Sequence, residues 1–389
     1  MGGYAGRAGP SEGVHDDLEC HALAVEGNDG NVAVVVSADL VAVCREDVET
    51  LKSRVKARLG LPPENLLFAA THTHSGPRTA ALFGEPWEGT GELMGVAFEA
   101  VELALEDLRP ADVEAIGGTI GGVGYNRREW DPSSEVVDET AVALVVRDGG
   151  SGKVRGVAFN YGLHPVVLPA ENLLVSADWP HFTREILARS LLPSGVAFVT
   201  FLQGATGNVN PFNVPFNGNK VPNTFADAER VGAMVADGLR GVLQASDQNE
   251  PGVKRLEVAG GVRCATKTVT LRADDPEKLE DFTWATLVEV GGQPAVQTVV
   301  QVLNLGGFFV AAVPGELFAE LGLRLRASLP SDPSFVVTTA NDYVGYVTTR
   351  AAYEAGGYEA LAMGLSATEG EELLAALDEL ASNLTFSPR

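Results

Sequence analysis

The pattern that most constrains the fold is an alternation of short apolar runs with amphipathic helical segments. In its clearest instance, an apolar run at 32–36 precedes a segment with an apolar residue at every third or fourth position from Val48 to Leu59. A second apolar run follows at 66–70. Acidic residues lie early in the middle segment and basic residues late, as the dipole of a helix favours. This spacing predicts a strand, a helix and a second strand in succession.

The same alternation recurs over the rest of the chain. Further strands are expected at 154–161, 196–202, 262–271, 295–313 (as a pair) and 335–339. Further helices are expected around 180–191, near 226–244, from Pro314 onward, and from a capping box at Thr368 and Glu371 onward. Strands that alternate with helices indicate an α/β fold. We expect one large domain over residues 1–389, with mixed, largely parallel sheets flanked by helices and ligand-binding groups at the carboxyl ends of the strands.

The charge of the chain excludes several classes of partner. It carries 28 basic and 52 acidic residues, and the net charge of −24 repels nucleic acid and anionic membrane surfaces. The first residues lack a signal-peptide pattern, and polar residues interrupt the longest apolar stretch, at 295–313. Three scattered cysteines are too few for a disulfide framework or a cysteine-rich zinc site. We therefore expect a cytoplasmic protein that neither binds nucleic acid nor inserts stably into a membrane.

Histidines and a carboxylate follow the ends of predicted strands. In the sequence Thr-His-Thr-His-Ser-Gly-Pro, His72 and His74 are two residues apart, so in an extended segment both side chains face the same way. His164 precedes a proline just after the strand at 154–161, and Glu316 follows the sequence Val-Pro-Gly. Neutral imidazole and carboxylate are common zinc ligands. Gathered at one edge of a sheet, these groups predict a mononuclear zinc site with an open position for water.

Two further clusters supply amides and phenols. Residues 203–211 combine glycines with amide side chains, which suit a substrate carbonyl or an oxyanion, and residues 341–346 add two tyrosines. Each cluster also has a purely structural interpretation. The histidines suit hydrogen-bonded loops, Glu316 suits the first turn of a helix, the glycines suit a tight turn, and the tyrosines suit packing. For any one cluster taken alone, both interpretations stay open.

Together these motifs resemble the catalytic region of the neutral (alkaline, non-lysosomal) ceramidases and their short bacterial relatives. The match runs in order through Gly3-Tyr4-Ala5, the His-x-His stretch, Tyr125-Asn126-Arg127, the histidine before proline, the Gly-Asn-Val-Asn-Pro stretch at 207–211, Pro314-Gly315-Glu316 and residues 343–359. The resemblance implies a zinc-dependent hydrolase of linear amides. It implies one zinc ion per chain, held by His72, His164, Glu316 and Tyr346. It also implies that the scissile amide is contacted by His74, Arg127 and Tyr358.

The chain departs from the ceramidase pattern in three ways. Where ceramidases carry a serine in Gly-Asp-x-Ser-Pro, this chain has Asn210, whose amide forms hydrogen bonds but no acyl-enzyme. Full ceramidases continue into a β-sandwich domain, whereas this chain ends at Arg389, so we expect that domain to be absent. Ceramidases also have a strand ahead of the Gly-Tyr motif, so we expect either a lost edge strand or a start upstream of Met1.

These observations lead to a hypothesis for the mechanism. We expect cleavage of a carboxamide, an N-acyl bond, by attack of a zinc-bound water without a serine. Hydrogen bonds from His74, Tyr358 and Asn210 are expected to stabilise the oxyanion. Arg127 is expected to orient a carboxylate or carbonyl of the substrate, because its planar fork suits such groups.

Groups around this centre carry weaker signals. Asp39 and Asp178 lie just past strand ends, where each is expected either to hold an imidazole N–H or to cap the next turn. Apolar residues at 80–87 and 212–216 are expected either to line a pocket for an acyl chain or to pack as loops.

Three other functions are alternatives. A zinc-dependent esterase or lactonase would attack related carbonyls, and a non-catalytic ligand-binding relative would account for the lost serine. A phosphatase is disfavoured, since the sequence offers no second metal-binding cluster and the acidic surface repels anions. We expect a neutral or cationic small-molecule amide or ester as the substrate, and the resemblance implies lipid or sphingolipid metabolism as its context.

Overall fold

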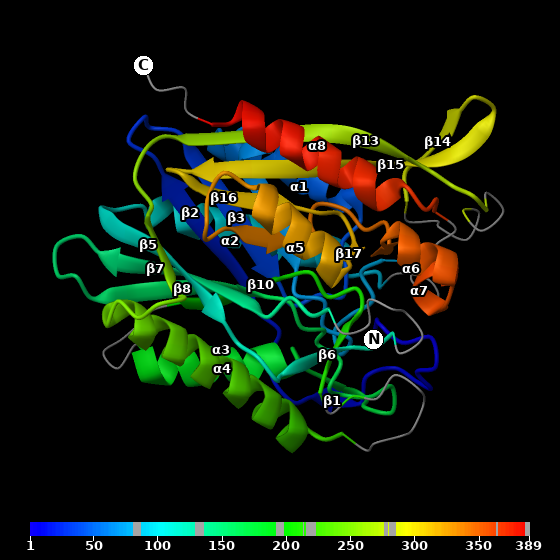
Figure 1. The fold of residues 1–389 in the computed structure, drawn as a ribbon, viewed down its shortest axis with the longest axis horizontal. Coiled ribbons are helices and arrows are strands. Elements are labelled where there is room, and N and C mark those ends of the chain that lie inside the picture. The colour runs from blue at the N-terminus through cyan, green and yellow to red at the C-terminus, as the bar shows by residue number, and fades with distance from the viewer. Residues whose placement is uncertain are drawn as a thin grey trace.

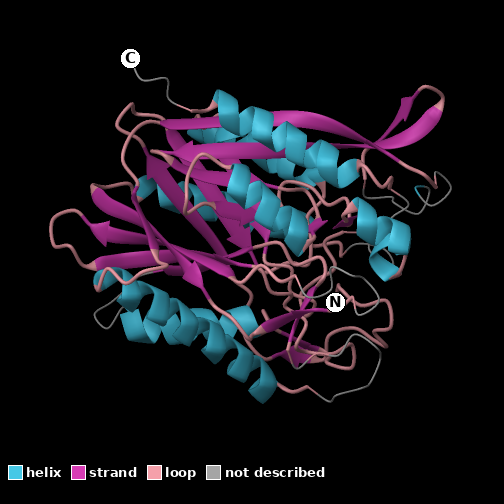
Figure 2. Ribbon diagram, in the orientation of Figure 1, coloured by secondary structure: helices cyan, strands magenta, loops and turns pink. Residues whose placement is uncertain are grey.

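The computed structural model describes residues 1–385 except 81–86, 129–135, 192–197, 213, 215–222, 276–278, 280–284 and 363–364. In this part of the chain, three larger β-sheets lie inside and helices pack on their outer faces (Figure 1, Figure 2). The expected α/β fold with mixed sheets is confirmed.

The first sheet contains the predicted strand-helix-strand unit. Strands β3 (Val32–Ala38) and β4 (Leu66–Ala70) are parallel neighbours, joined by helix α1 (Arg45–Leu59) and the short 3-10 helix η1 (Pro63–Asn65). Strand β2 (Cys20–Glu26) pairs antiparallel with the other edge of β3. Helix α1 and a second helix, α2 (Thr90–Glu106), bury the apolar side chains of this sheet. The prediction over 32–70 is therefore confirmed.

The second sheet has the strand order β10-β8-β7-β5-β12. Its strands are β5 (Ala111–Thr119), β7 (Thr140–Asp148), β8 (Val154–Tyr161), β10 (Phe198–Gln203) and β12 (Lys254–Glu257). Helices α3 (Trp179–Leu191) and α4 (Phe225–Asp247) pack against each other and against this sheet (Figure 1). Their positions agree with the helices expected around 180–191 and near 226–244.

The third sheet has the order β13-β15-β16-β18, with β14 paired to β15. Its strands are β13 (Val262–Arg272), β14 (Leu287–Val290), β15 (Gln293–Leu305), β16 (Phe308–Ala312) and β18 (Phe335–Val337). Helices α5 (Ala319–Ser328) and α8 (Glu369–Asn383) share its apolar core, and α8 lies across β13 and β15 (Figure 1).

Short elements complete the described part and carry several candidate site residues. The two-stranded pairs are β1 (Gly13–Val14) with β9 (Leu174–Val175), β6 (Gly124–Asn126) with β11 (Val209–Pro211), and β17 (Glu316–Leu317) with β19 (Tyr346–Val347). The short helices are α6 (Arg350–Ala355) and α7 (Tyr358–Ala362). None of the helices in the described ranges is long and apolar enough to cross a bilayer.

Some details differ from the sequence-based expectations. The sheets are mixed but not largely parallel, because most of the strand pairs within the described ranges are antiparallel. The helix expected from Pro314 begins only at Ala319, because the preceding residues pair with β19 as strand β17. Glu316 therefore does not lie in the first turn of a helix. The terminal helix begins at Glu369 as expected, but Thr368 makes no side-chain capping hydrogen bond to it.

One apolar core joins the three larger sheets. It contains Leu67 of β4, Ala158 of β8 and Val310 of β16, all buried. Ala69 of β4 also forms an isolated bridge with Ala340. The loops that follow β4, β8 and β16 meet at one end of this core, where their histidines and glutamate come into contact.

Candidate metal centre and active site

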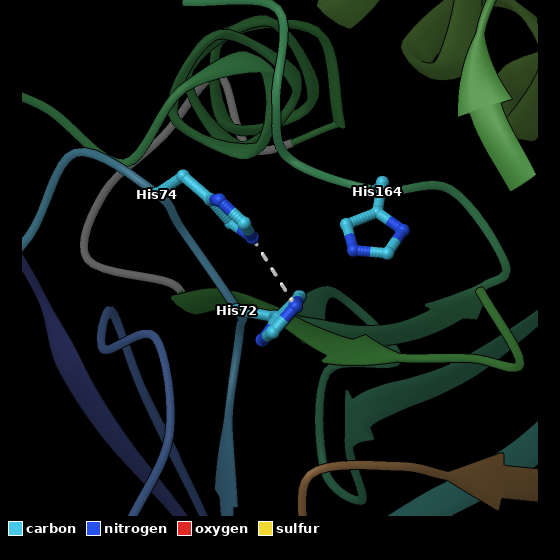
Figure 3. Close-up of side chains that lie close together, drawn as sticks. All are labelled: His72, His74 and His164. Atoms are coloured by element: carbon cyan, nitrogen blue, oxygen red, sulfur yellow. Dashed lines mark hydrogen bonds between the residues drawn. The ribbon is translucent and has the colours of Figure 1, made fainter. Parts of the chain in front are cut away.

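Three histidines from two loops converge beyond the ends of β4 and β8. His72 and His74 follow β4, His164 follows β8, and their ligand nitrogens all lie within 4.8 Å of one another (Figure 3). Nε2 of His72 is 3.3 Å from Nε2 of His74. The backbone of His72 has a φ of 69°, an uncommon conformation for a residue with a side chain. Both imidazoles of the His-x-His sequence thus reach the same point.

Backbone carbonyls orient two of these imidazoles. Nδ1 of His72 donates to the carbonyl of Val41 at 2.6 Å, and Nδ1 of His164 donates to the carbonyl of Thr206 at 2.7 Å. Since a carbonyl only accepts, Nδ1 carries the hydrogen of each neutral ring and Nε2 keeps its lone pair. A hydrogen bond of this kind sets the orientation and basicity of a metal-binding histidine.

The carboxylate of Glu316 faces the imidazoles. Its Oε2 lies 3.1 Å from Nε2 of His164 and 3.4 Å from Nε2 of His72. Its Oε1 accepts a hydrogen bond of 2.5 Å from the hydroxyl of Tyr343, which leaves Oε2 for the histidines. Sequence reasoning missed this role of Tyr343, because the pattern around it does not distinguish it from a packing tyrosine.

The donor atoms fit a zinc ion. Among the described residues, Nε2 of His164 and Oε2 of Glu316 are buried without a hydrogen-bond partner. Burying such polar atoms unpaired destabilises the fold, and a bound cation would remove this cost. Tetrahedral zinc, with ligand bonds of about 2.0–2.1 Å, separates its donor atoms by about 3.3–3.4 Å. Oε2 of Glu316 lies 3.1 Å from Nε2 of His164 and 3.4 Å from Nε2 of His72, and both distances are close to that separation.

Burial and proximity set the protonation of these groups. Burial lowers the pKa of His164 to about 4, and Arg127 and His72 act in the same direction. Burial, reinforced by His72 and His164, lowers the pKa of His74 well below its usual value. Burial by itself raises the pKa of Glu316, but the charge and hydrogen bonds of His72 and His164, when these rings are protonated, outweigh burial and hold that pKa well below its usual range. His74, His164 and Glu316 are therefore in the protonation states that metal binding requires at neutral pH.

Tyr346 lies beside the centre in contact with Arg127. It is opposite Glu316 in the β17–β19 pair, and its hydroxyl accepts a hydrogen bond from Nη2 of Arg127 at 3.3 Å. Burial and the neighbouring Glu316 raise the pKa of Tyr346 well above its usual range. The geometry groups His74 with the other two histidines, whereas the resemblance names Tyr346 as the fourth ligand and places His74 at the substrate.

The guanidinium of Arg127 is committed to protein partners. Its Nη1 donates to Oδ1 of Asn210 at 3.1 Å and its Nη2 to the carbonyl of Gly207 at 2.8 Å. Its Nε donates to Glu359 at 2.8 Å, and the residue is 6% exposed. Protein acceptors engage all three of its nitrogens, so a role of Arg127 in orienting a substrate carboxylate or carbonyl stays a prediction.

Asp39 and Asp178 do not orient the imidazoles. Asp39 instead receives two hydrogen bonds from the guanidinium of Arg184, at 2.9 and 2.7 Å. Asp178 accepts hydrogen bonds from the backbone N–H groups of Val167, Leu168 and Trp179. It therefore caps the turn into α3 and holds the loop that follows His164. Of the two expectations for Asp178, the cap is the one that the structure shows.

Tyr358 lies at the edge of the site. It starts α7, is 48% exposed, and its ring centroid is 5.7 Å from that of Tyr346. Most of the expected apolar lining, at 81–86 and 215–216, lies outside the described residues. Phe212 packs, partly buried, against the core of the second sheet.

The first residues of the chain pack against His74. The ring centroids of Tyr4 and His74 are 4.8 Å apart, and Nη2 of Arg7 donates to the carbonyl of His74 at 2.6 Å. Gly3 has a φ of 96°, and a Cβ on it would lie 2.6 Å from Cγ of His74. Only glycine allows the chain to approach the imidazole this closely. Sequence reasoning found this segment only as a family motif.

Two solved structures share this fold over the whole chain. The neutral ceramidase from Pseudomonas aeruginosa matches with a TM-score of 0.79 and 18% sequence identity, covering 100% of this chain and 74% of that one. A ceramidase complexed with C2 matches with a TM-score of 0.82, 18% identity and the same coverage. No protein-family model matches the chain. The expected resemblance to the neutral ceramidases is therefore confirmed at the level of the fold.

Proposed function

We propose that the chain is a zinc-dependent hydrolase that cleaves a carboxamide, an N-acyl bond, in a small molecule. The observation that carries this proposal is the pair of buried donors without hydrogen-bond partners, Nε2 of His164 and Oε2 of Glu316, beside Nε2 of His72. The fold supports it, since a solved structure that shares the fold is a neutral ceramidase.

We assign the ion to His72, His164 and Glu316, with Tyr346 as the fourth ligand. Zinc supplies a Lewis acid for the carbonyl and lowers the pKa of water to about 7. In this assignment His74 stays free of the metal and donates from its Nε2 to the substrate. The contacts of Tyr4 and Arg7 keep its ring beside His72.

Asn210 and Tyr358 are the other proposed donors to the carbonyl oxygen as it gains negative charge. Arg127 holds Oδ1 of Asn210, so the amide presents Nδ2 on its other side, where Nδ2 donates one hydrogen to the carbonyl of Val214 at an N···O distance of 3.4 Å. The second hydrogen of Nδ2 suits the oxyanion. Tyr358, which packs beside Tyr346 at the exposed edge of the site, is proposed to donate from its hydroxyl.

The substrate class follows from Asn210 and from the charge. An amide side chain forms no acyl-enzyme, so water is the nucleophile. The net charge of −24 disfavours extraction of a lipid from an anionic bilayer. We therefore propose a neutral or cationic N-acyl amide, and not ceramide, as the preferred substrate.

Metal analysis tests the ligand assignment. Protein purified without added zinc is expected to carry about one zinc per chain, and His72→Ala, Glu316→Gln and Tyr346→Phe are expected to lose most of it. His74→Ala and the exposed-pair control Glu371→Gln are expected to retain it. Unchanged zinc in His72→Ala and Glu316→Gln would contradict the assignment. If His74→Ala loses zinc while Tyr346→Phe retains it, the fourth ligand is His74 and not Tyr346.

A substrate panel tests the reaction. Zinc-loaded protein is offered amides, esters and lactones with the same acyl chain, together with ceramide. The proposal expects turnover of amides. Turnover of esters or lactones with amides untouched would identify an esterase or lactonase, and tight binding without turnover would identify a non-catalytic relative. Ceramide hydrolysed faster than every other amide would contradict the role given to Asn210.

A further inference from the structure

We infer that Glu359 is a positioning residue, whose buried carboxylate holds the guanidinium of Arg127 and, through it, the amide of Asn210 in the orientation that turnover requires. This inference rests on the proposed function, because it concerns the rate of the same site. In the sequence, Glu359 stands only as the last residue of the matched stretch at 343–359, with no role of its own.

Glu359 is buried between two arginines. It is 1% exposed, its Oε1 accepts from Nε of Arg127 at 2.8 Å, and its Oε2 accepts from Nη1 of Arg128 at 2.8 Å. Arg128 is also 1% exposed and donates from Nη2 to the carbonyls of Ala352 and Gly356. The carboxylate therefore joins the segment of α6 and α7 to the end of β6.

The contact with Glu359 restricts Arg127 at the atom that controls its orientation. A guanidinium is planar, so an acceptor at Nε fixes the directions of both Nη groups. In this orientation Nη1 reaches Oδ1 of Asn210, and Nη2 reaches the carbonyl of Gly207 and the hydroxyl of Tyr346. Without an acceptor at Nε, the side chain can turn, and Asn210 loses the contact that sets its amide.

The charges around Glu359 explain why a single substitution that removes its carboxylate is a poor test. Its carboxylate is the direct partner of two buried cations, and removing one member of such a group leaves uncompensated charge in the interior. Glu359→Ala would therefore combine loss of position with loss of stability. Double variants that also remove the charge of Arg128 separate these effects.

The experiment compares two double variants that share Arg128→Met. In Glu359→Gln with Arg128→Met, the amide oxygen still accepts from Nε of Arg127. In Glu359→Leu with Arg128→Met, no acceptor is present at that position. We expect kcat of the leucine double variant to be about ten- to 100-fold lower than that of the glutamine double variant. KM is expected to differ less than about threefold between the two, and their zinc content to be equal. Asp138→Asn, at the buried contact with Arg326, controls for general loss of stability.

A rescue supplies the second comparison. In Glu359→Gln alone, the single amide oxygen is shared between two guanidinium groups, so kcat is expected to fall and to rise again when Arg128→Met is added. Equal kcat in the two double variants, or no recovery on adding Arg128→Met, would overturn the inference.

Hydrogen–deuterium exchange separates this inference from the proposed function. Peptides covering 206–211 carry both Gly207 and Asn210, so their exchange is expected to be faster in the leucine double variant than in the glutamine one. If the parent turns over no substrate, the proposed function fails, yet this difference still supports the positioning of Arg127. Identical exchange in the two variants would refute it.

Discussion

The imidazole of His74 is confined by the first residues of the chain, and Gly3→Ala tests that confinement. The added Cβ would lie 2.6 Å from Cγ of His74, on a backbone with a φ of 96°. We expect kcat/KM to fall about tenfold or more, because the ring must move out of register with the substrate. Gly6→Ala is the matched control, since nothing lies within 4 Å of a Cβ placed there. Equal losses in both variants, measured by steady-state kinetics, would contradict this prediction.

A second prediction at the residue scale concerns Tyr343. Tyr343→Phe removes the hydroxyl that donates to Oε1 of Glu316 and leaves the ring, which lies within 6.4 Å of His72 between centroids. We expect zinc affinity to fall about 10- to 100-fold with the fold intact, as for other groups that orient a metal ligand. Competition with a chelator of known affinity measures this. Tyr353→Phe, whose hydroxyl contacts Asp274, should leave zinc affinity unchanged.

The spacing of residue types in the sequence made some of the site residues predictable, whereas others could not be recognised from it. The spacing of His72 and His74 led us to expect that both rings reach one point, but the extended backbone behind that expectation is absent, since His72 has a φ of 69°. The groups that orient the rings are carbonyls of Val41 and Thr206, and a backbone acceptor leaves no trace in residue type. Of the two expectations left open for Asp39, holding an imidazole N–H is not seen, since its carboxylate bonds to Arg184. Its partner Arg184 comes from α3, far along the chain.

At the scale of elements, the start of α8 predicts a pH dependence of stability. Glu369 is 3% exposed and accepts hydrogen bonds from the backbone of Arg272 and the hydroxyl of Ser366. Burial, with the nearby Glu372, raises its pKa from 4.5 to about 7. The folded protein therefore binds this proton more tightly than the unfolded chain does. The free energy of unfolding consequently declines as pH rises from about 4.5 through about 7.

Glu369→Gln removes that titration. We expect the difference in unfolding free energy between about pH 5 and pH 8, measured with denaturant, to be smaller in this variant than in the parent. Glu229→Gln, on the exposed side of α4, should retain the parental difference. A parental difference that persists unchanged in Glu369→Gln would show that other groups cause it.

The elements also show how far local patterns reach. The unit from β3 to β4 and the helices α3 and α4 follow from periodicity, because apolar spacing reports which face of an element is buried. Periodicity does not report the direction of a strand's neighbour, so β5 and β7 could not be recognised as antiparallel partners. Glu316 illustrates the same limit. Its place in β17 depends on pairing with β19, which lies beyond α5 and β18 in the chain.

At the scale of the whole molecule, zinc removal should weaken the fold. The proposed ligands come from loops that follow strands of all three larger sheets, so a bound ion ties these layers together. A ligand at 100 times its Kd stabilises the folded state by about 2.7 kcal/mol. We therefore expect a chelator to lower Tm by several degrees in calorimetry. His164→Ala should show a much smaller shift, and an equal shift in both proteins would contradict the prediction.

The distribution of the donors along the chain bears on how the protein matures. His72, His164 and Glu316 lie after β4, β8 and β16, and only the complete set of sheets brings them within contact. When synthesis has reached only β10, the chain already contains His72 and His164 but not yet Glu316, the carboxylate of the proposed site. Contacts between such distant positions require long stretches of chain to close, which slows their formation. We therefore expect the proposed metal site to be complete only once all three larger sheets have formed, so that binding of the ion follows folding.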